Sequence, residues 1–285
     1  MQVVKTAEDL AAALRRLRPE GRVGFTPTMG ALHAGHLSLI AASKKACAVT
    51  VASIFVNPTQ FNQAADLTTY PRTPGRDVRL LEGAGCDVAF LPEVETVYPP
   101  SLDTTLNLEL GTLATVMEGE QRPGHFAGMA QVVNRLLDLV QPDALFMGQK
   151  DYQQAAIVAE MLRQTDHKVE LVRCPIMREA DGLAMSSRNL RLTPEWRMKA
   201  PQLNEMLRKL ASQLNERAPN ELETAGMTTL QSAGFRPEYV SIVHPRTLQS
   251  IEKFDAQTGA VICVAAWAAD VRLIDNLLFE PQPSA

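Results

Sequence analysis

Cysteine is scarce in this 285-residue chain, and its four cysteines lie far apart. They form no Cys-x-x-Cys pair, which argues against a zinc site and against a compact disulfide framework. The sequence therefore predicts reduced thiols in a cytoplasmic protein. The four positions are Cys47, Cys86, Cys174 and Cys263.

Aromatic residues make up only 5% of the chain, which leaves no stacking platform for bases or sugars. Positive charge is not in excess, because 28 Lys and Arg stand against 32 Asp and Glu, for a formal net charge of −4. A polynucleotide binder carries a basic footprint, so we expect no nucleic-acid partner. Any anionic ligand must then be bound by local groups.

Long hydrophobic runs are also missing, although 46% of the residues are hydrophobic. No apolar stretch reaches the roughly 20 residues that a membrane span requires. The first ten residues include Lys5, Glu8 and Asp9 and do not form a secretory signal. We therefore expect no membrane partner.

The first 175 residues alternate short apolar runs with helical patterns, which is typical of βαβ units on a parallel sheet. The expected strands cover residues 23–28, 49–56, 87–91, 143–147 and 169–175. The expected helices cover 36–46, 74–83, 130–140 and 152–164. This pattern predicts a Rossmann-like, doubly wound parallel sheet over residues 1–175, with chemistry on the loops that follow the strands.

The pattern changes near Pro175, which predicts a smaller α+β domain over residues 176–285. Its expected elements are a polar loop over 177–191, a charged helical stretch over 193–218, a helix over 220–233 and strands over 239–243 and 260–266.

A motif rich in glycine and histidine, residues 27–36, leads from the first expected strand into a helix. A helix N-terminus can hold phosphate, and Gly30 and Gly35 let a nucleotide approach the backbone closely. His33 and His36 would then face the phosphates as hydrogen-bond donors. The alternative is that two histidines three apart only cap the helix or fill the core. A metal site is a weaker interpretation, because no third ligand has matching spacing.

A second motif, Gly148 to Gln154, follows the strand expected over 143–147. Here Lys150 would lie beside phosphates and Asp151 beside ribose hydroxyls. Alternatively, Asp151 only caps a helix and Lys150 is a solvated charge.

The third motif, Met185 to Asn189, lies in the polar loop after Pro175. Its two serine hydroxyls and the Arg188 guanidinium make a phosphate clamp, similar to the lysine and serine loop that closes over ATP in class I aminoacyl-tRNA synthetases. A polar linker is the alternative.

Together these stretches resemble the pantothenate synthetase family, the pantoate–β-alanine ligases of the nucleotidyltransferase superfamily. The matches run from one end of the chain to the other in the family's order. They cover residues 27–36, 53–61, 70–73, 118–126, 148–154, 185–189 and 272–276.

The resemblance implies roles for individual residues. His36 matches the family's proton donor, Gln60 matches a contact of both pantoate and β-alanine, and Gln154 matches a second pantoate contact. The positions that match ATP-binding residues are Met29, Gly30, Ala31, Leu32, His33, Ala34, Gly35, His36, Gly148, Gln149, Lys150, Asp151, Met177, Met185, Ser186, Ser187 and Arg188. Two residues depart from the common pattern: Gln149 stands where glutamate is frequent, and Ala65 replaces an acidic residue.

The resemblance further implies an activity, the ATP-dependent condensation of pantoate with β-alanine to pantothenate. It would proceed through pantoyl adenylate and release AMP and pyrophosphate, in coenzyme A biosynthesis. Mg²⁺ would be held mainly by phosphate oxygens and water, so no protein ligand is predicted for it. The family also implies a homodimer, and the smaller domain would act as a lid that excludes water.

Three other functions compete with this interpretation. A nucleotidyltransferase that adds AMP to a phosphorylated substrate shares the histidine motif, but two glutamines at the acid site favour a carboxylate with hydroxyls. An aminoacyl-tRNA synthetase would need a basic surface for tRNA. Against a nucleotide-sensing protein that lost its chemistry stand four intact residues, His33, His36, Lys150 and Arg188.

Overall fold

The computed structural model describes residues 1–60, 67, 68 and 70–281. The chain divides into two compact units. The N-terminal unit comprises residues 1–114, 118–148 and 154–175, and the C-terminal unit comprises 115–117, 149–153 and 176–285.

The N-terminal unit is built on a six-stranded sheet in the order β1-β4-β3-β2-β5-β6, in which every pairing is parallel. This confirms the predicted doubly wound fold. The order reverses between β2 and β5, and such a switch point is where parallel sheets bind ligands. The strands are β1 (Gln2–Val4), β2 (Val23–Thr28), β3 (Val49–Ile54), β4 (Val88–Phe90), β5 (Ala144–Gly148) and β6 (Glu170–Cys174).

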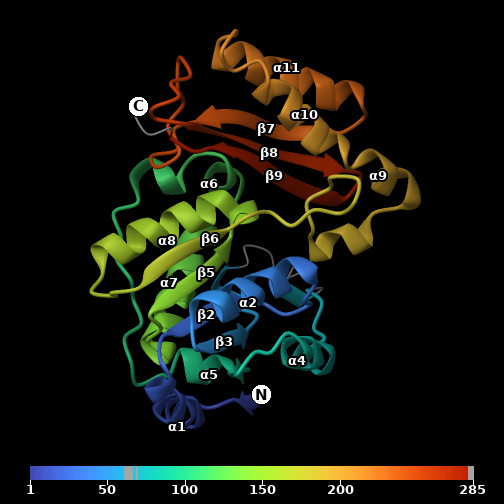
Figure 1. The fold of residues 1–285 in the computed structure, drawn as a ribbon. Coiled ribbons are helices and arrows are strands. Elements are labelled where there is room, and N and C mark those ends of the chain that lie inside the picture. Colours follow the sequence, from blue (N-terminus) through green and yellow to red (C-terminus); the bar gives the residue numbers. More distant parts are fainter. Residues whose placement is uncertain (61–66, 69, 282–285) are drawn as a thin grey trace. The chain divides into compact units, whose positions relative to one another are not determined.

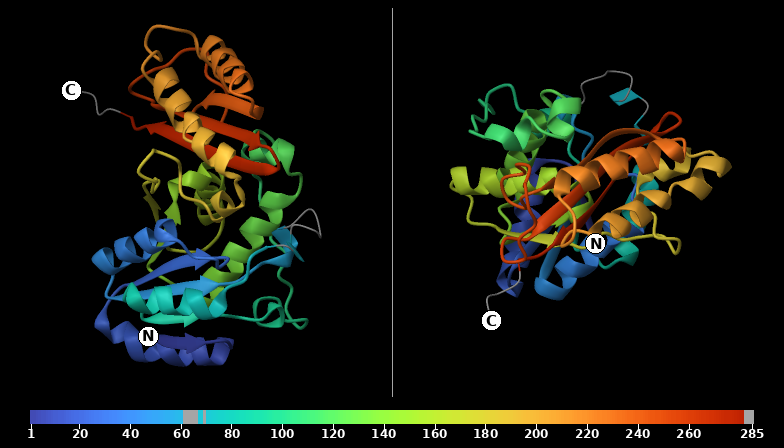
Figure 2. Two further views of the ribbon diagram at one scale, coloured as in Figure 1. Left: turned by 90° about the vertical axis from the view of Figure 1, so that its right-hand side faces the viewer. Right: turned by 90° about the horizontal axis from the view of Figure 1, so that it is seen from above.

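Helices cover the two faces of this sheet (Figure 1). Right-handed crossovers place α2 and α4 on one face and α1, α7 and α8 on the other. Figure 2 gives two further views of these layers. The helices are α1 (Ala7–Leu17), α2 (Ala34–Ala46), α4 (Pro74–Gly83), α5 (Val94–Val97), α6 (Glu118–Gln121), α7 (His125–Val140) and α8 (Tyr152–Gln164).

Two N-terminal elements, β1 and α1, were not among those expected from the sequence. Strand β1 has only three residues, too few for an alternating pattern. Helix α1 is marked by Thr6, whose hydroxyl accepts from the backbone N–H of Asp9 as an N-cap. Helix α7 begins at His125, five residues before the expected start, after Gly124 in the left-handed region at φ 80°.

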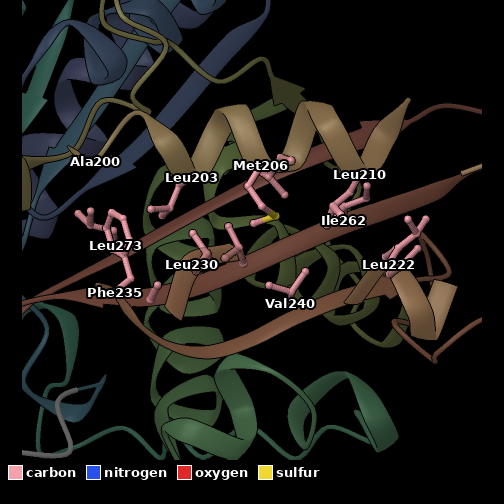
Figure 3. Close-up of a cluster of buried hydrophobic side chains, with 14 of the residues drawn as sticks. Ala200, Leu203, Met206, Leu210, Leu222, Leu230, Phe235, Val240, Ile262 and Leu273 are labelled. Atoms are coloured by element: carbon pink, nitrogen blue, oxygen red, sulfur yellow. The ribbon is translucent and has the colours of Figure 1, made fainter. Parts of the chain in front are cut away.

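The C-terminal unit is α+β, as predicted, with an antiparallel sheet in the order β7-β8-β9. Its strands are β7 (Arg236–Val243), β8 (Ala260–Ala268) and β9 (Val271–Phe279), and its helices are α9 (Pro194–Lys199), α10 (Gln202–Ala211) and α11 (Pro219–Ser232). Side chains of α10 and α11 pack on the sheet, among them Leu203, Met206 and Leu230 (Figure 3).

The structure differs from the expectations for this unit in two places. The charged helical stretch expected over 193–218 contains two helices, because Pro201 lacks a backbone N–H and stands at the N-cap of α10. Strand β9 was not predicted, because its inward and outward positions do not alternate cleanly between apolar and polar residues. Asp275 and Asn276 are both buried near its middle.

No helix in the described part of the chain is long and apolar enough to cross a membrane.

Candidate active site

The segment after β2 turns sharply through two left-handed residues, Gly30 at φ 84° and Ala31 at φ 50°. Asp77, fully buried on α4, holds this turn. Its carboxylate accepts from the backbone N–H of Ala31 at 3.0 Å and of Leu32 at 2.8 Å. The hydroxyl of Thr73 donates to the same carboxylate. Glycine suits position 30, because L side chains rarely adopt its φ and a Cβ there would lie 3.0 Å from Asp77 Oδ2.

His33 and His36 form a capping box at the N-terminus of α2. Nδ1 of His33 accepts from the N–H of Gly35 at 3.1 Å, and Nδ1 of His36 accepts from the N–H of His33 at 3.3 Å. The two ring centroids are 4.1 Å apart. Both histidines therefore cap the helix, as the alternative interpretation predicted.

Capping also fixes the tautomer of both rings. A nitrogen that accepts a hydrogen bond carries no proton, so a neutral His33 or His36 carries its proton on Nε2. The first turn of α2 contains no acidic residue of its own, and the nearby Asp77 carboxylate is already bound to the backbone N–H groups of Ala31 and Leu32. The two Nε2–H groups and the positive end of the helix dipole are together suited to binding an anion.

Gln60 lies on the 3-10 turn η2 (Pro58–Gln60) that follows β3, and its side chain is largely buried. Its Nε2 lies 2.7 Å from Sδ of Met29, so the ends of β2 and β3 meet here. His125 on α7 bonds through Nδ1 to the backbone oxygen of Gln60 at 2.9 Å. Gly128 packs so closely that a Cβ there would lie 2.3 Å from the Thr59 oxygen.

Asn57 organises the start of η2. It is buried, and its Nδ2 donates to the oxygen of Gly128 at 3.1 Å and to Thr59 Oγ1 at 2.9 Å. Tyr98 donates to Asn57 Oδ1 at 3.1 Å. Burial raises the pKa of Tyr98, which keeps the phenol protonated as a donor. These bonds fix the backbone that carries Gln60.

A pocket of about 440 Å³ opens at the carboxyl ends of β2, β3 and β4. Met29 and Gly30 line it after β2, Val56 and Pro58 after β3, and Pro92 after β4. Within the described part of the chain, Met29 and Gly30 are the two predicted site residues among those that line this cavity.

In the C-terminal unit, η4 (Gln149–Asp151) carries the lysine of the second motif. The Lys150 side chain is only 16% exposed, and its Nζ lies 4.0 Å from an Asp151 carboxylate oxygen. Asn276 of β9 donates from Nδ2 to the backbone oxygens of Gln149 and Lys150, both at 2.9 Å.

The polar loop after Pro175 forms a small hairpin followed by the 3-10 turn η5 (Ser187–Arg191). The N–H of Met185 donates to the oxygen of Met177, which closes the hairpin. Ser186 caps η5 by accepting from the N–H of Arg188 at 3.2 Å. This loop belongs to the same unit as Lys150, although it is distant from η4 in the sequence. It carries three of the predicted residues, Met177, Met185 and Arg188.

Arg178 and Asp275 anchor the hairpin to β9. The guanidinium donates to both oxygens of the Asp275 carboxylate, at 2.7 and 3.0 Å. Burial raises the pKa of Asp275, and the Arg178 charge opposes that rise. Breaking such a pair would leave a buried charge uncompensated.

The predicted site residues fall in both units. The N-terminal unit holds 29–36, Gln60, Gly148 and Gln154, the last half-buried on the first turn of α8. The C-terminal unit holds 149–151, Met177 and 185–188. Ala65 lies outside the described residues, as does Phe61 of the 53–61 stretch.

Three polar residues that the sequence did not single out support these segments: Asp77, Asn57 and Asn276. Each is buried and makes at least one hydrogen bond to a backbone group 45 or more positions away. Asn57 makes local hydrogen bonds as well. The only sequence signal was their place within stretches that resemble the family, or next to one.

Among the described residues, no group of three or more His, Cys, Asp or Glu side chains could hold a metal ion. All four cysteines are free and buried, and burial raises the pKa of Cys86 to about 11.

Known proteins resemble this chain over its whole length. The family model for pantoate-beta-alanine ligase matches residues 2–278. Pantothenate synthetase from Bacteroides thetaiotaomicron is 46% identical over 282 residues, covering 98% of this chain and 99% of the relative.

Solved structures agree with this sequence match. Pantothenate synthetase from Thermus thermophilus superposes with a TM-score of 0.90 at 44% identity, covering 99% of this chain and 100% of the other. Pantoate-beta-alanine ligase from Francisella tularensis, solved in complex with beta-gamma ATP and beta-alanine, gives 0.80 at 34% identity, with both chains covered completely. The chain therefore belongs to the pantoate–β-alanine ligase family, whose members are ligases.

Proposed function

We propose that this enzyme condenses pantoate with β-alanine in two steps, through an enzyme-bound pantoyl adenylate. The observation that carries this proposal is the N-terminus of α2, where two histidines cap the helix through Nδ1 and the first turn contains no acidic residue. That arrangement suits the phosphates of ATP. Pantoate, β-alanine and Mg²⁺-ATP are the proposed substrates.

In the first step a carboxylate oxygen of pantoate attacks the α-phosphorus of ATP. The new P–O bond replaces the bond to the β-phosphate bridging oxygen, and pyrophosphate leaves with its electron pair. His36 would donate its Nε2 proton toward a phosphate oxygen as charge develops there. His33 supplies a second donor at the same helix end.

Lys150 and the Met185–Arg188 segment would stabilise the pyrophosphate. The ammonium of Lys150, the hydroxyls of Ser186 and Ser187 and the Arg188 guanidinium all donate to phosphate oxygens. Mg²⁺ would arrive with ATP, held by phosphate oxygens and water.

In the second step the neutral amine of β-alanine attacks the acyl carbon of pantoyl adenylate. The C–O bond to AMP breaks, AMP leaves with its electron pair, and the nitrogen gives up one proton to solvent as the amide forms. Gln60 and Gln154 would hold pantoate, since a neutral amide can both donate to its hydroxyls and accept from them.

The test is to incubate the protein with Mg-ATP and pantoate, with and without β-alanine, and to identify the products. We expect pyrophosphate exchange into ATP that depends on pantoate, and AMP and pantothenate only when β-alanine is added. ATP hydrolysis that ignores pantoate, or AMP transfer to a phosphorylated acid, would overturn the proposal.

Three further expectations remain predictions. Residues 176–285 would act as a lid that protects the adenylate from water. Variants of these residues should then release AMP in the presence of pantoate without β-alanine, and the rate of that release measures the protection. Light scattering would test the homodimer, and fractionation of cells would test the cytoplasmic location.

A further inference from the structure

The stretch Arg272–Asn276 matches the family but has no part in the mechanism proposed above. It lies on β9, an edge strand that pairs only with β8 among the described residues. Asp275 is 4% exposed and Asn276 is 2% exposed. Two adjacent polar side chains buried on an edge strand need hydrogen-bond partners, and those partners indicate what the residues do.

The Asn276 amide makes three hydrogen bonds to η4. Its Nδ2 donates to the backbone oxygens of Gln149 and Lys150 at 2.9 Å, and its Oδ1 accepts from Gln149 Nε2 at 3.2 Å. The peptide planes on both sides of the Lys150 Cα are thereby fixed. The backbone from which the lysine side chain departs is therefore held on both sides by this amide.

Asp275 holds the other segment through Arg178. The guanidinium that pairs with Asp275 also donates to the oxygen of Gly182 within the hairpin, at 3.0 Å. The hairpin ends at Met185, directly before the Ser186 cap of η5. One dipeptide of β9 therefore anchors both segments of the C-terminal unit that carry predicted ATP-binding residues.

Two other hydrogen bonds of this region anchor residues that follow the lysine in the chain. Tyr152 donates to the oxygen of Pro245 at 2.9 Å, and Gln153 donates to the oxygen of Val116 at 2.8 Å. Both fix the start of α8, beyond η4. Glu238 and Arg272 form an ion pair that joins two strands of the same sheet, and their side chains are 17% and 16% exposed. This pair has a structural role only and provides the control for Asn276.

We propose that Asn276 is a positioning residue for Lys150. The proposal rests on the proposed role of Lys150 in adenylate formation. A purely structural role would lower stability without distinguishing the two half-reactions.

The first experiment compares Asn276→Ala with Glu238→Ala in the full-length enzyme. Pantoate-dependent ATP–pyrophosphate exchange should fall about ten- to thirtyfold in Asn276→Ala, with KM for pantoate within about twofold. Attack of β-alanine on adenylate formed beforehand, followed by rapid quench, should change less than about twofold. Glu238→Ala should lower the melting temperature and leave both half-reactions near wild type. Equal losses in both half-reactions of Asn276→Ala would overturn the proposal.

Graded variants keep the test decisive if Asn276→Ala does not fold. Asn276→Asp keeps the size and an acceptor but loses both N–H donors, so it should lose exchange as Asn276→Ala does. Asn276→Ser retains one donor and should give an intermediate rate. Wild-type exchange in a folded Asn276→Asp would overturn the proposal.

A double-mutant cycle with Lys150→Ala separates this proposal from the mechanism beneath it. If Asn276 acts through the lysine, Lys150→Ala with Asn276→Ala should be no more than about threefold slower than Lys150→Ala alone. Losses that multiply would overturn the positioning role while leaving Lys150 in place. A Lys150→Ala enzyme with wild-type exchange would instead overturn the proposed function of the lysine.

Discussion

The two units hold their proposed ATP-binding segments with opposite backbone groups. In the N-terminal unit, Asp77 accepts from the N–H groups of Ala31 and Leu32. In the C-terminal unit, Asn276 donates to the carbonyl groups of Gln149 and Lys150. The first anchor orients a turn that leads into a helix N-terminus, where N–H groups are in surplus. The second occupies carbonyl oxygens, the groups that would repel phosphate.

This contrast suggests a division of work. The N-terminal unit carries both histidines of the helix cap and Gln60, groups suited to the α-phosphate and the acid, which are present in both half-reactions. The C-terminal unit carries Lys150 and Arg188, cations suited to a pyrophosphate that has left before β-alanine reacts. Variants of the two units should therefore differ in which half-reaction they affect.

The largest effect is expected at His36. We expect His36→Ala to lower turnover at least about a hundredfold, the scale for losing one preorganised donor. His36→Asn keeps an acceptor near the Nδ1 position, so it should retain more of the helix cap but lose as much activity. Turnover and thermal melting of both variants test this. A folded His36→Asn enzyme with the wild-type rate would remove His36 from the chemistry.

Lys150→Ala should distinguish the half-reactions most clearly. We expect adenylate formation to fall about ten- to a hundredfold, because a cation that stabilises developing phosphate charge is lost. Attack by β-alanine should change little. Single-turnover measurement of each step provides the check, and equal losses would mean that Lys150 serves general positioning.

Gln60 and Gln154 should set specificity for the acid. A buried amide that loses its hydroxyl partner costs roughly 1 to 3 kcal/mol, so an analogue of pantoate lacking one hydroxyl should react about ten- to a hundredfold less efficiently with the wild type. Replacing either glutamine by alanine should shrink that ratio and lower activity on pantoate. Values of kcat/KM for both acids decide this, and a ratio unchanged in both variants would contradict the contacts.

Asp77→Asn tests the anchor of the N-terminal unit. Both carboxylate oxygens accept from backbone N–H groups, so an amide places an NH₂ group against a donor. We expect a loss of about 1 to 3 kcal/mol in unfolding free energy, measured with denaturant. Both half-reactions should slow together, unlike in Lys150→Ala. A loss confined to adenylate formation would contradict the proposed difference between the units, in which variants of the N-terminal unit slow both half-reactions.

The smallest effect is expected for Gln149→Glu, which introduces the residue common in the family. The side chain loses its donor to Asn276 Oδ1, whereas the two bonds from Asn276 Nδ2 to backbone oxygens remain. We expect turnover to stay within about fivefold of wild type, since one partly exposed hydrogen bond contributes about 1 kcal/mol. Steady-state assays give the comparison, with Gln149→Ala as the control.

Local patterns allowed most of the N-terminal sheet to be predicted. Strands such as β2 and β3 are buried on both faces and appear in the sequence as short apolar runs between turns. The helix that follows β2 was visible as well, and the spacing of His33 and His36 matches a capping box. These signals lie within a few residues of the feature that they describe.

The anchors could not be predicted, because nothing local marks them. Asp77 looks like one more acidic residue in a surface helix, and its partners are 45 and 46 positions away. Strand β9 was missed for a related reason: Asp275 and Asn276 face partners in distant segments, which places polar residues where an apolar pattern was expected. Only the tertiary structure supplies those partners.

Strand β9 has a consequence for how the enzyme matures on the ribosome. Lys150 precedes Asn276 by 126 positions, and Arg178 precedes Asp275 by 97. A nascent chain that has already completed its parallel sheet still lacks the residues that fix these two segments. Domains fold as synthesis proceeds, so the sheet can form early while catalysis awaits the final strand. An unfinished chain would thus be folded over much of its length without being able to consume ATP.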